Sequence, residues 1–291
     1  MREKYESLSL AALRDIAKAR KLKGVSTMKK SELIELMLEQ DEKDKAKEVK
    51  EEIKNEKAGV ADIEQLDSGM VAHGIIEVLP DGYGFIRSDN YLPGENDVYV
   101  SPSQIRRFGL KTGDIISGNT RIKTQAEKFS ALLYLTKING VSPSEATKRA
   151  NFEDMTPIFP NERLRLENGQ SSTAMRIVDL LSPIGKGQRG MIVSPPKAGK
   201  TTLLKQVAQS VLKNNPEMHL LILLIDERPE EVTDIKEAIT GENVEVIYST
   251  FDELPEHHRR VSEMVIERAK RLVEHKKDVM ILLDSITRLA R

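Results

Sequence analysis

The chain has 291 residues, enough for about two domains and a sizeable buried core. Its net charge of −1 excludes bulk positive charge as a source of nucleic-acid binding, so such binding would need a local basic patch. Cysteine is absent, which excludes disulfides and thiolate metal sites, and the charged start and the lack of an apolar run of about 20 residues predict a cytoplasmic protein with no membrane contact.

Residues 1–40 carry apolar side chains at helical spacing, which predicts a small N-terminal helical domain. Gly24 is expected to end its first helix. The basic helix ends either contact phosphates or are solvated lysines of a packing module. Residues 41–67 follow as a linker, because most of them up to Ala58 are charged, with both signs mixed.

In residues 68–137 the apolar side chains recur with a period of two, which is typical of short β-strands. Turn signals such as Pro80-Asp-Gly82 separate the apolar runs. Several short strands at this spacing predict a small β-barrel. The strand candidates are His73–Leu79, Gly84–Ser88, Asp97–Val100 and Asp114–Ser117.

Aromatic residues concentrate in this predicted barrel, since seven of the twelve Tyr and Phe residues lie between Tyr83 and Tyr134. Tyr83, Phe85 and Arg87 alternate along one strand and are expected to share a face. Rings beside a guanidinium suit unpaired nucleic acid, whose bases stack on aromatic side chains with about 1–3 kcal/mol per base. The alternative is that both rings belong to the barrel core.

Residues 138–175 are expected to be a connector without chemistry of its own. Residues 176–291 alternate strands and helices, which predicts a parallel α/β sheet with crossover helices. The expected strands are His219–Ile225, Val244–Thr250 and Val279–Leu283, with a long helix over Glu256–Glu274.

A phosphate-loop pattern lies near the start of this α/β region. The apolar run Met191–Val193 predicts a buried strand, and Lys200–Lys213 predicts the helix that follows. Between them, Ser194-Pro-Pro-Lys-Ala-Gly-Lys-Thr201 fits G-x-x-x-x-G-K-[ST] except at its first position. Lys200 is expected to reach nucleotide phosphates at the helix start, and the Thr201 hydroxyl to bind Mg²⁺. The alternative is a helix start without a ligand.

Acidic residues follow two of the predicted strands. Asp284 ends the last strand, as in a Walker B motif, where a carboxylate holds the Mg²⁺ shell. Glu227 ends a neighbouring strand and is a candidate general base that orients the attacking water. The alternative for Glu227 is a salt bridge with Arg228.

Four segments in this order resemble the family of transcription termination factor Rho: Ser182–Gly190, Pro195–Thr201, Leu224–Val232 and Leu282–Arg291. The resemblance extends to the barrel and the N-terminal helices. It implies a multidomain homohexamer with an OB-fold or cold-shock-like barrel and a RecA-like P-loop ATPase domain. Such a ring binds nascent single-stranded RNA, preferably pyrimidine-rich, and uses ATP and Mg²⁺ as a helicase to release the RNA from the RNA polymerase elongation complex.

The same resemblance implies roles for individual residues. Glu227 and Lys200 would be catalytic, and Thr201 and Asp284 would bind the metal. The residues implied to contact RNA are Asp81, Gly82, Tyr83, Gly84, Phe85, Ile86, Arg87, Asp97, Val98, Tyr99, Glu127, Lys128 and Phe129. The residues implied to contact ATP are Gly185, Lys186, Gly187, Gln188, Arg189, Gly190, Lys197, Ala198, Gly199, Lys200, Thr201, Thr202 and Arg228.

The family pattern continues beyond the Walker B strand, whereas this sequence stops at Arg291. The resemblance therefore implies a truncated ATPase domain without the RNA-gripping loops and the arginine finger, and we expect weak or absent ATP hydrolysis. One alternative is an RNA-binding module with a vestigial, non-hydrolysing nucleotide site. Another is a rotary ATP synthase catalytic subunit, which shares the Pro-Ile-Gly-x-Gly-Gln-Arg segment but has no reason to carry the predicted stacking barrel.

Overall fold

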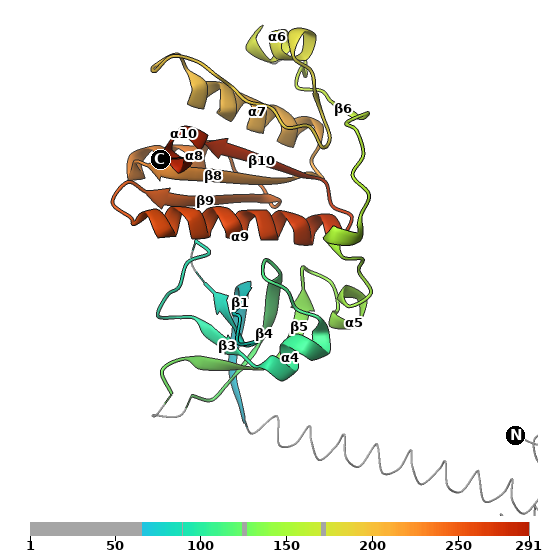
Figure 1. Cartoon of the computed structure of the whole chain (residues 1–291), viewed down its shortest axis with the longest axis vertical. Coiled ribbons are helices and arrows are strands. Elements are labelled where there is room, and N and C mark those ends of the chain that lie inside the picture. The colour runs from blue at the N-terminus through green and yellow to red at the C-terminus, as the bar shows by residue number, and fades with distance from the viewer. Residues whose placement is uncertain (1–65, 89, 124–126, 170–172, 291) are drawn as a thin grey trace, which may run out of the picture. The chain divides into compact units, whose positions relative to one another are not determined.

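The computed structural model describes residues 66–88, 90–123, 127–169 and 173–290. The predicted N-terminal helical domain and nearly all of the predicted linker lie outside these residues. The described part of the chain forms a closed β-barrel followed by an α/β region with a parallel sheet (Figure 1). None of its helices is both long and apolar enough to cross a lipid bilayer.

The barrel confirms the strand pattern of the sequence. Its five strands close in the order β1-β2-β3-β5-β4, with β3 and β5 parallel and the other neighbours antiparallel. This order, with a helix between the third and fourth strands, is an OB-like arrangement. The elements are β1 (Asp67–Val78), β2 (Gly84–Arg87), β3 (Val98–Val100), α4 (Pro102–Phe108), β4 (Ile115–Arg121) and β5 (Ser130–Ile138). Strand β5 and helix α4 are not among the elements that the sequence predicts.

Alternation along the strands fills the barrel core. Ile76 of β1, Ile86 of β2 and Ile116 of β4 are almost fully buried in one cluster of aliphatic side chains. The residues next to them in each strand lie outside this cluster, as a period of two requires, although Ile75 beside Ile76 is also buried. Helix α4 closes one end of the barrel and begins with a capping box between Ser101 and Gln104.

The α/β region is built on a three-stranded parallel sheet in the order β10-β8-β9. Its strands match the predicted ones to within two residues. The strands are β8 (His219–Glu227), β9 (Val244–Thr250) and β10 (Val279–Asp284), and the helices are α7 (Lys200–Asn214), α8 (Pro229–Ala238), α9 (Pro255–Glu274) and α10 (Ile286–Leu289). The smaller elements before them are α5 (Pro143–Ala146), the 3₁₀ turn η1 (Phe152–Asp154), β6 (Arg163–Leu164), α6 (Thr173–Leu181) and β7 (Ile184–Gly185).

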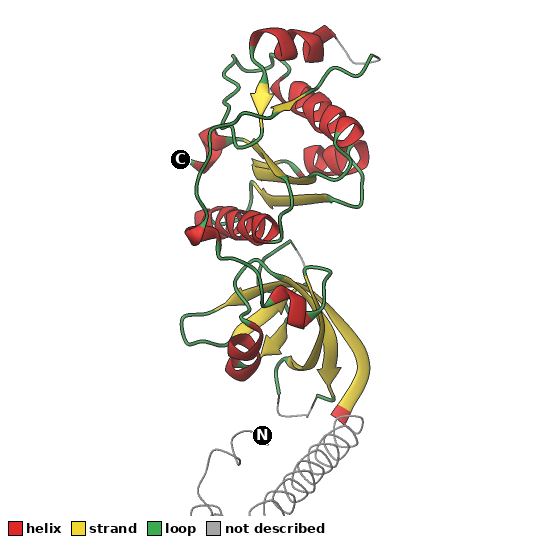
Figure 2. Cartoon of the chain, turned by 90° about the vertical axis from the view of Figure 1, so that its right-hand side faces the viewer, coloured by secondary structure: helices red, strands yellow, loops and turns green. Residues whose placement is uncertain are grey.

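Strand β8 is apolar on both faces because helices cover both. Leu220, Ile222 and Leu224 pack with α7 and α8, whereas the alternate residues Leu221 and Leu223 pack with α9. Figure 2 shows α9 on one side of the sheet and α7 and α8 on the other. A central parallel strand buried in this way explains the continuous apolar run of the sequence.

The predicted strand Met191–Val193 is wrong. These residues form an irregular segment before α7, with Met191 71% and Val193 83% exposed. A strand forms only where a neighbour supplies a backbone ladder, and strand preference depends on that context. Among the described residues none pairs with the outer edge of β10, so the apolar run has no ladder to join.

Polar side chains connect the barrel with α9. Glu274 accepts a hydrogen bond from Lys111 at 2.9 Å and forms an ion pair with Arg149 at 3.1 Å, and Arg268 donates to the Asn139 side chain at 2.8 Å. The side chain of Asn90 accepts from Tyr248 N at 2.9 Å and donates to Tyr248 O, so it pairs with the edge strand β9. The barrel and the sheet are therefore joined by specific hydrogen bonds.

The turn at Gly113 yields a stability prediction. Gly113 has φ +96°, and a Cβ atom there would lie 2.5 Å from the backbone carbon of Glu267 in α9. Gly113→Ala is therefore expected to lower the free energy of unfolding by about 2–4 kcal/mol through backbone strain and overpacking. Gly109→Ala is the matched control, since Gly109 also has positive φ but open space around it, and should cost only about 1 kcal/mol. Equal losses in urea unfolding would contradict the close approach.

Candidate functional sites

Four aromatic rings gather on the outer side of the barrel. Phe85 of β2 and Tyr99 of β3 are register partners, and Tyr83 and Phe129 lie beside them. Neighbouring ring centroids are 5.1–6.0 Å apart, and all four side chains are partly exposed. None belongs to the aliphatic barrel core. We call these four residues the ring cluster.

Arg87 lies next to the ring cluster but is only 6% exposed. Its guanidinium is 5.0 Å from the centre of the Phe85 ring. Its Nε donates to Glu77 of β1 at 2.8 Å, its Nη2 forms an ion pair with the same carboxylate at 2.7 Å, and it also pairs with Asp97. Arg87 therefore shares the face of Phe85, as the alternation predicts, but it is held by two carboxylates.

Asp97 has an acceptor without a partner beside the ring cluster. Its side chain is 1% exposed, and its Oδ2 atom accepts from Gly94 N at 3.0 Å and from Arg87. Its Oδ1 atom is buried and accepts no hydrogen bond in the structure. An unsatisfied buried acceptor costs free energy, so a donor from a ligand would be favourable at this position.

The remaining residues implied to contact RNA are distributed unevenly. Ile86 and Val98 belong to the barrel core, so their side chains are unavailable to a ligand. Gly84 is required by packing, because a Cβ atom there would lie 2.8 Å from Glu77 O. At the edges of the ring cluster, Asp81 and Lys128 are exposed, Gly82 has φ +86°, and Glu127 pairs with Arg121.

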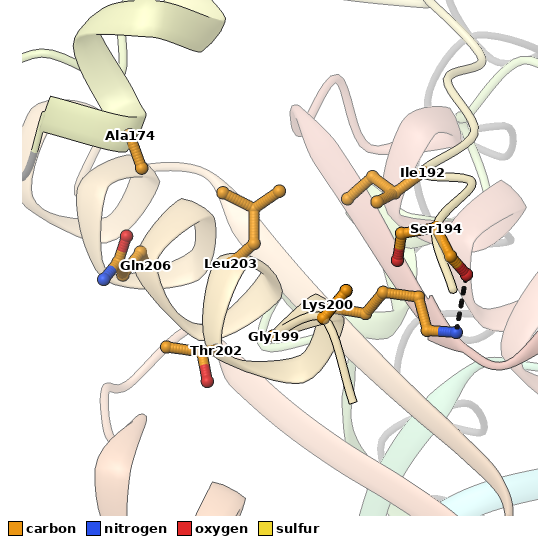
Figure 3. Close-up of a pocket in the computed structure, with 9 residues that line it drawn as sticks. Ala174, Ile192, Ser194, Gly199, Lys200, Thr202, Leu203 and Gln206 are labelled. Carbon is orange, nitrogen blue, oxygen red and sulfur yellow. Dashed lines mark hydrogen bonds between the residues drawn. The ribbon is translucent and has the colours of Figure 1, made fainter. Parts of the chain in front are cut away.

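Helix α7 begins directly after the predicted phosphate loop. Gly199 precedes the helix with φ +81°, and Lys200 is its first residue. A pocket of about 380 Å³ opens here, lined by Ala174, Ile192, Ser194, Ala198, Gly199, Lys200, Thr202, Leu203 and Gln206. Figure 3 shows the Lys200 side chain reaching toward the Ser194 carbonyl, at 3.5 Å from Nζ. The first turn of α7 thus faces an open space.

Thr201 and Asp284 meet at this end of the sheet. Thr201 Oγ1 donates to Asp284 Oδ2 at 2.8 Å, although 83 positions separate them in the sequence. Both are oxygen ligands of the kind that Mg²⁺ prefers, and Mg²⁺ commonly takes one or two protein ligands together with waters and phosphates. No group of three or more His, Cys, Asp or Glu residues in the described chain could hold a metal by itself. The pair therefore fits Mg²⁺ better than a metal held by protein ligands alone.

Glu227 lies at the carboxyl end of β8 and is 6% exposed. The β8–β9 register shifts between Ile225 and Glu227, and Asp226 between them has φ +56°. This bulge lets Asp226 remain partly exposed while Glu227 turns inward. Burial, followed by the nearby Glu231, raises the pKa of Glu227 to about 8.

The arginine beside Glu227 is Arg288, not Arg228. Arg288 Nη1 is 3.4 Å from Glu227 and 3.9 Å from Asp226, whereas Arg228 lies exposed at the start of α8, 4.0 Å from Glu230. The salt bridge with Arg228 that the sequence left open does not form. Arg288 lies in α10, which begins two residues after Asp284 ends β10, and this position close behind the Walker B carboxylate is the signal by which it could have been found.

Lys186 of the segment Gly185–Gly190 lies at the end of β10 opposite to the Thr201–Asp284 pair. Lys186 binds Glu162 at 2.5 Å and Asp278 at 2.6 Å, and these partners raise its pKa. Asp278 immediately precedes β10, whereas Asp284 ends that strand. Gln188 is occupied by a hydrogen bond from Gly185 N at 2.8 Å. In this structure Lys186 anchors its loop, and its contact with ATP stays a prediction.

Comparisons with known proteins match three parts of the chain. Residues 72–144 match the Rho termination factor RNA-binding domain, and residues 4–45 match the Rho termination factor N-terminal domain. Residues 174–291 match the nucleotide-binding domain of the ATP synthase alpha/beta family. The first of these spans the ring cluster and the last spans the Thr201–Asp284 pair.

Curated relatives named transcription termination factor Rho are similar over long stretches. The protein of Aquifex aeolicus is 47% identical over 100% of this chain and 62% of its own length. The proteins of Pseudomonas aeruginosa and Escherichia coli are 57% and 56% identical over 75% of this chain, and the matched part covers 52% of each relative. The chain thus spans between half and two thirds of these relatives, and with its two Rho-type domains it belongs to the Rho family of transcription termination factors.

Proposed function

We propose that the chain binds single-stranded RNA on the ring cluster and ATP with Mg²⁺ at the start of α7, as an ATP-dependent transcription termination factor. The observation that carries the proposal is that one chain holds both the ring cluster and the Thr201–Asp284 pair. Partly exposed rings offer stacking surfaces to unpaired bases. A helix start beside two oxygen ligands suits a nucleotide phosphate with its metal.

The whole protein, in this proposal, is a homohexameric helicase in the cytoplasm that moves along nascent RNA and releases it from the RNA polymerase elongation complex. The names of the curated relatives support termination as the outcome. The match to an ATP synthase-type nucleotide-binding domain supports ATP as the energy source. Lys200 would bind the phosphates, and the deprotonated form of Glu227, which its pKa of about 8 makes a minor form at neutral pH, would accept the proton of the attacking water.

Base preference follows from Asp97. Cytosine presents an exocyclic amine that donates hydrogen bonds, whereas uracil presents a carbonyl oxygen at the same position. The unpaired Oδ1 atom of Asp97 would accept from the amine of cytosine and repel the oxygen of uracil. We therefore propose that the site prefers pyrimidine-rich RNA and, among pyrimidines, cytosine.

Two substitutions test the two sites independently. Phe85→Ala should weaken binding of oligo(rC) by roughly 5- to 150-fold, the loss of one stacked base, and leave ATP binding unchanged. Lys200→Ala should weaken ATP binding roughly tenfold or more, through loss of a charged hydrogen bond, and leave RNA binding unchanged. Phe159→Ala, an exposed aromatic residue away from the ring cluster, is the control for Phe85. Wild-type protein that binds RNA but no ATP would favour the binding module with a vestigial nucleotide site.

Asp97→Asn tests the base preference. The amide can turn a donor toward the base, so the ratio of oligo(rC) to oligo(rU) affinity should fall by about tenfold. Fluorescence anisotropy with both oligonucleotides measures the ratio, and Glu95→Gln, an exposed acidic residue on the same loop, is the matched control. An unchanged ratio in a folded Asp97→Asn variant would exclude Asp97 from base selection.

The raised pKa of Glu227 predicts a pH dependence of stability. Between pH 4.5 and about 8 the folded protein keeps a proton that the unfolded chain releases, so stability falls as pH rises through this window. Glu227→Gln removes this titration and should reduce the decline between pH 5 and 8 by about 1–3 kcal/mol. Thermal unfolding at several pH values measures the difference, with exposed Glu237→Gln as control. Parallel pH profiles for wild type and Glu227→Gln would contradict the buried, protonated carboxyl.

A further inference from the structure

Glu77 of β1 is shared by two arginines from different parts of the fold. Its Oε2 atom accepts a hydrogen bond from Arg87 Nε of β2 at 2.8 Å and forms an ion pair with Arg87 Nη2 at 2.7 Å. Arg260 of α9 donates through one nitrogen, Nη2, to both oxygens of the same carboxylate, at 2.6 and 2.7 Å. One carboxylate of the barrel therefore connects a helix of the α/β region with the guanidinium beside the ring cluster.

These contacts form a row of alternating charges that ends at the proposed base pocket. In order the members are Arg260, Glu77, Arg87 and Asp97. The last three side chains are 14%, 6% and 1% exposed, so the row is buried at its pocket end and becomes more exposed toward Arg260. Two positive and two negative charges balance, and in a weakly polar interior such pairs are screened little.

Through this balance of charges Arg260 would affect the proposed base pocket, although it makes no contact with the pocket. Arg87 is held between two carboxylates, and the position of its guanidinium depends on how strongly each attracts it. Without Arg260, Glu77 would keep Arg87 as its single charged partner in the row and draw it away from Asp97. The row would also carry a net charge of −1 beside bound RNA, which is itself an anion.

We propose that Arg260 is a positioning residue for RNA base recognition, acting through Glu77 on Arg87 and Asp97. This inference rests on the proposed RNA-binding function of the ring cluster. It places a determinant of RNA affinity and base preference on α9, outside the barrel. Arg260 would contact no RNA itself.

The experiment uses the whole chain and measures anisotropy with oligo(rC) and oligo(rU) across a salt series. Arg260→Ala should weaken oligo(rC) binding roughly three- to tenfold and lower the preference for cytosine. This size is typical of the coupling between residues of one salt-bridge network. The RNA affinity of Arg260→Ala should depend on salt concentration as that of wild type does, because a residue that binds no phosphate releases no counterion. Arg259→Ala is the matched control, since Arg259 is exposed on the same helix and pairs with Glu263.

Two further variants separate positioning from loss of folding. Arg260→Lys keeps the charge and should retain most of the cytosine preference. In a Glu77→Gln background, Arg260→Ala should have little further effect on RNA binding, because the shared carboxylate is already neutral. Thermal unfolding of each variant shows whether the variant is folded at the temperature of the binding measurement.

The outcomes differ for the inference and for the function on which it rests. A wild-type chain that binds no oligo(rC) overturns the proposed function. A wild type that binds, with Arg260→Ala of equal affinity and equal cytosine preference, overturns only the role of Arg260. A salt slope that falls by about one unit in Arg260→Ala would mean a direct phosphate contact and would also overturn the positioning role.

Discussion

Parallel pairing of β8 with β10 and β9 is the constraint on which the α/β region depends. Because all three strands run the same way, their carboxyl ends meet at one edge of the sheet. Asp284 and Glu227 thereby come to the end where α7 begins, and Thr201 reaches Asp284 across 83 positions of sequence. Desolvation at this edge then sets the unusual pKa of Glu227. The proposed nucleotide site depends on strand direction more than on any single residue.

The sequence predicts those helices and strands whose hydrophobic periodicity can be recognised from their own residues alone. Strand β8 is apolar on both faces and α9 has a long amphipathic pattern, so both were predictable from local periodicity. The apolar run 191–193 has the same local composition as a strand but makes no ladder. Its conformation depends on a neighbour, which a local pattern does not contain. The bulge at Asp226 could not be predicted from the sequence either, because many aspartates follow strands without adopting a positive φ.

Some features of the ring cluster and its neighbours follow from the local sequence pattern, and others depend on residues that are distant in the sequence. Alternation in β2 correctly places the Phe85 ring and the Arg87 guanidinium on one face, because a strand fixes the direction of each side chain. Alternation does not reveal that Arg87 is held by Glu77 and Asp97, since those residues approach through barrel closure. Nor does it reveal Arg260, which comes from a helix more than 170 positions later. Recognition of a base would thus depend on charges that no single motif contains.

The side chain of Asn90 has a consequence of another kind. Its amide accepts from Tyr248 N and donates to Tyr248 O, so it occupies hydrogen-bonding positions on the outer edge of β9 that a further strand would use. Open strand edges recruit strands from other molecules and start aggregates. A loop of the barrel therefore occupies part of the β9 edge at which a strand of another molecule could otherwise pair.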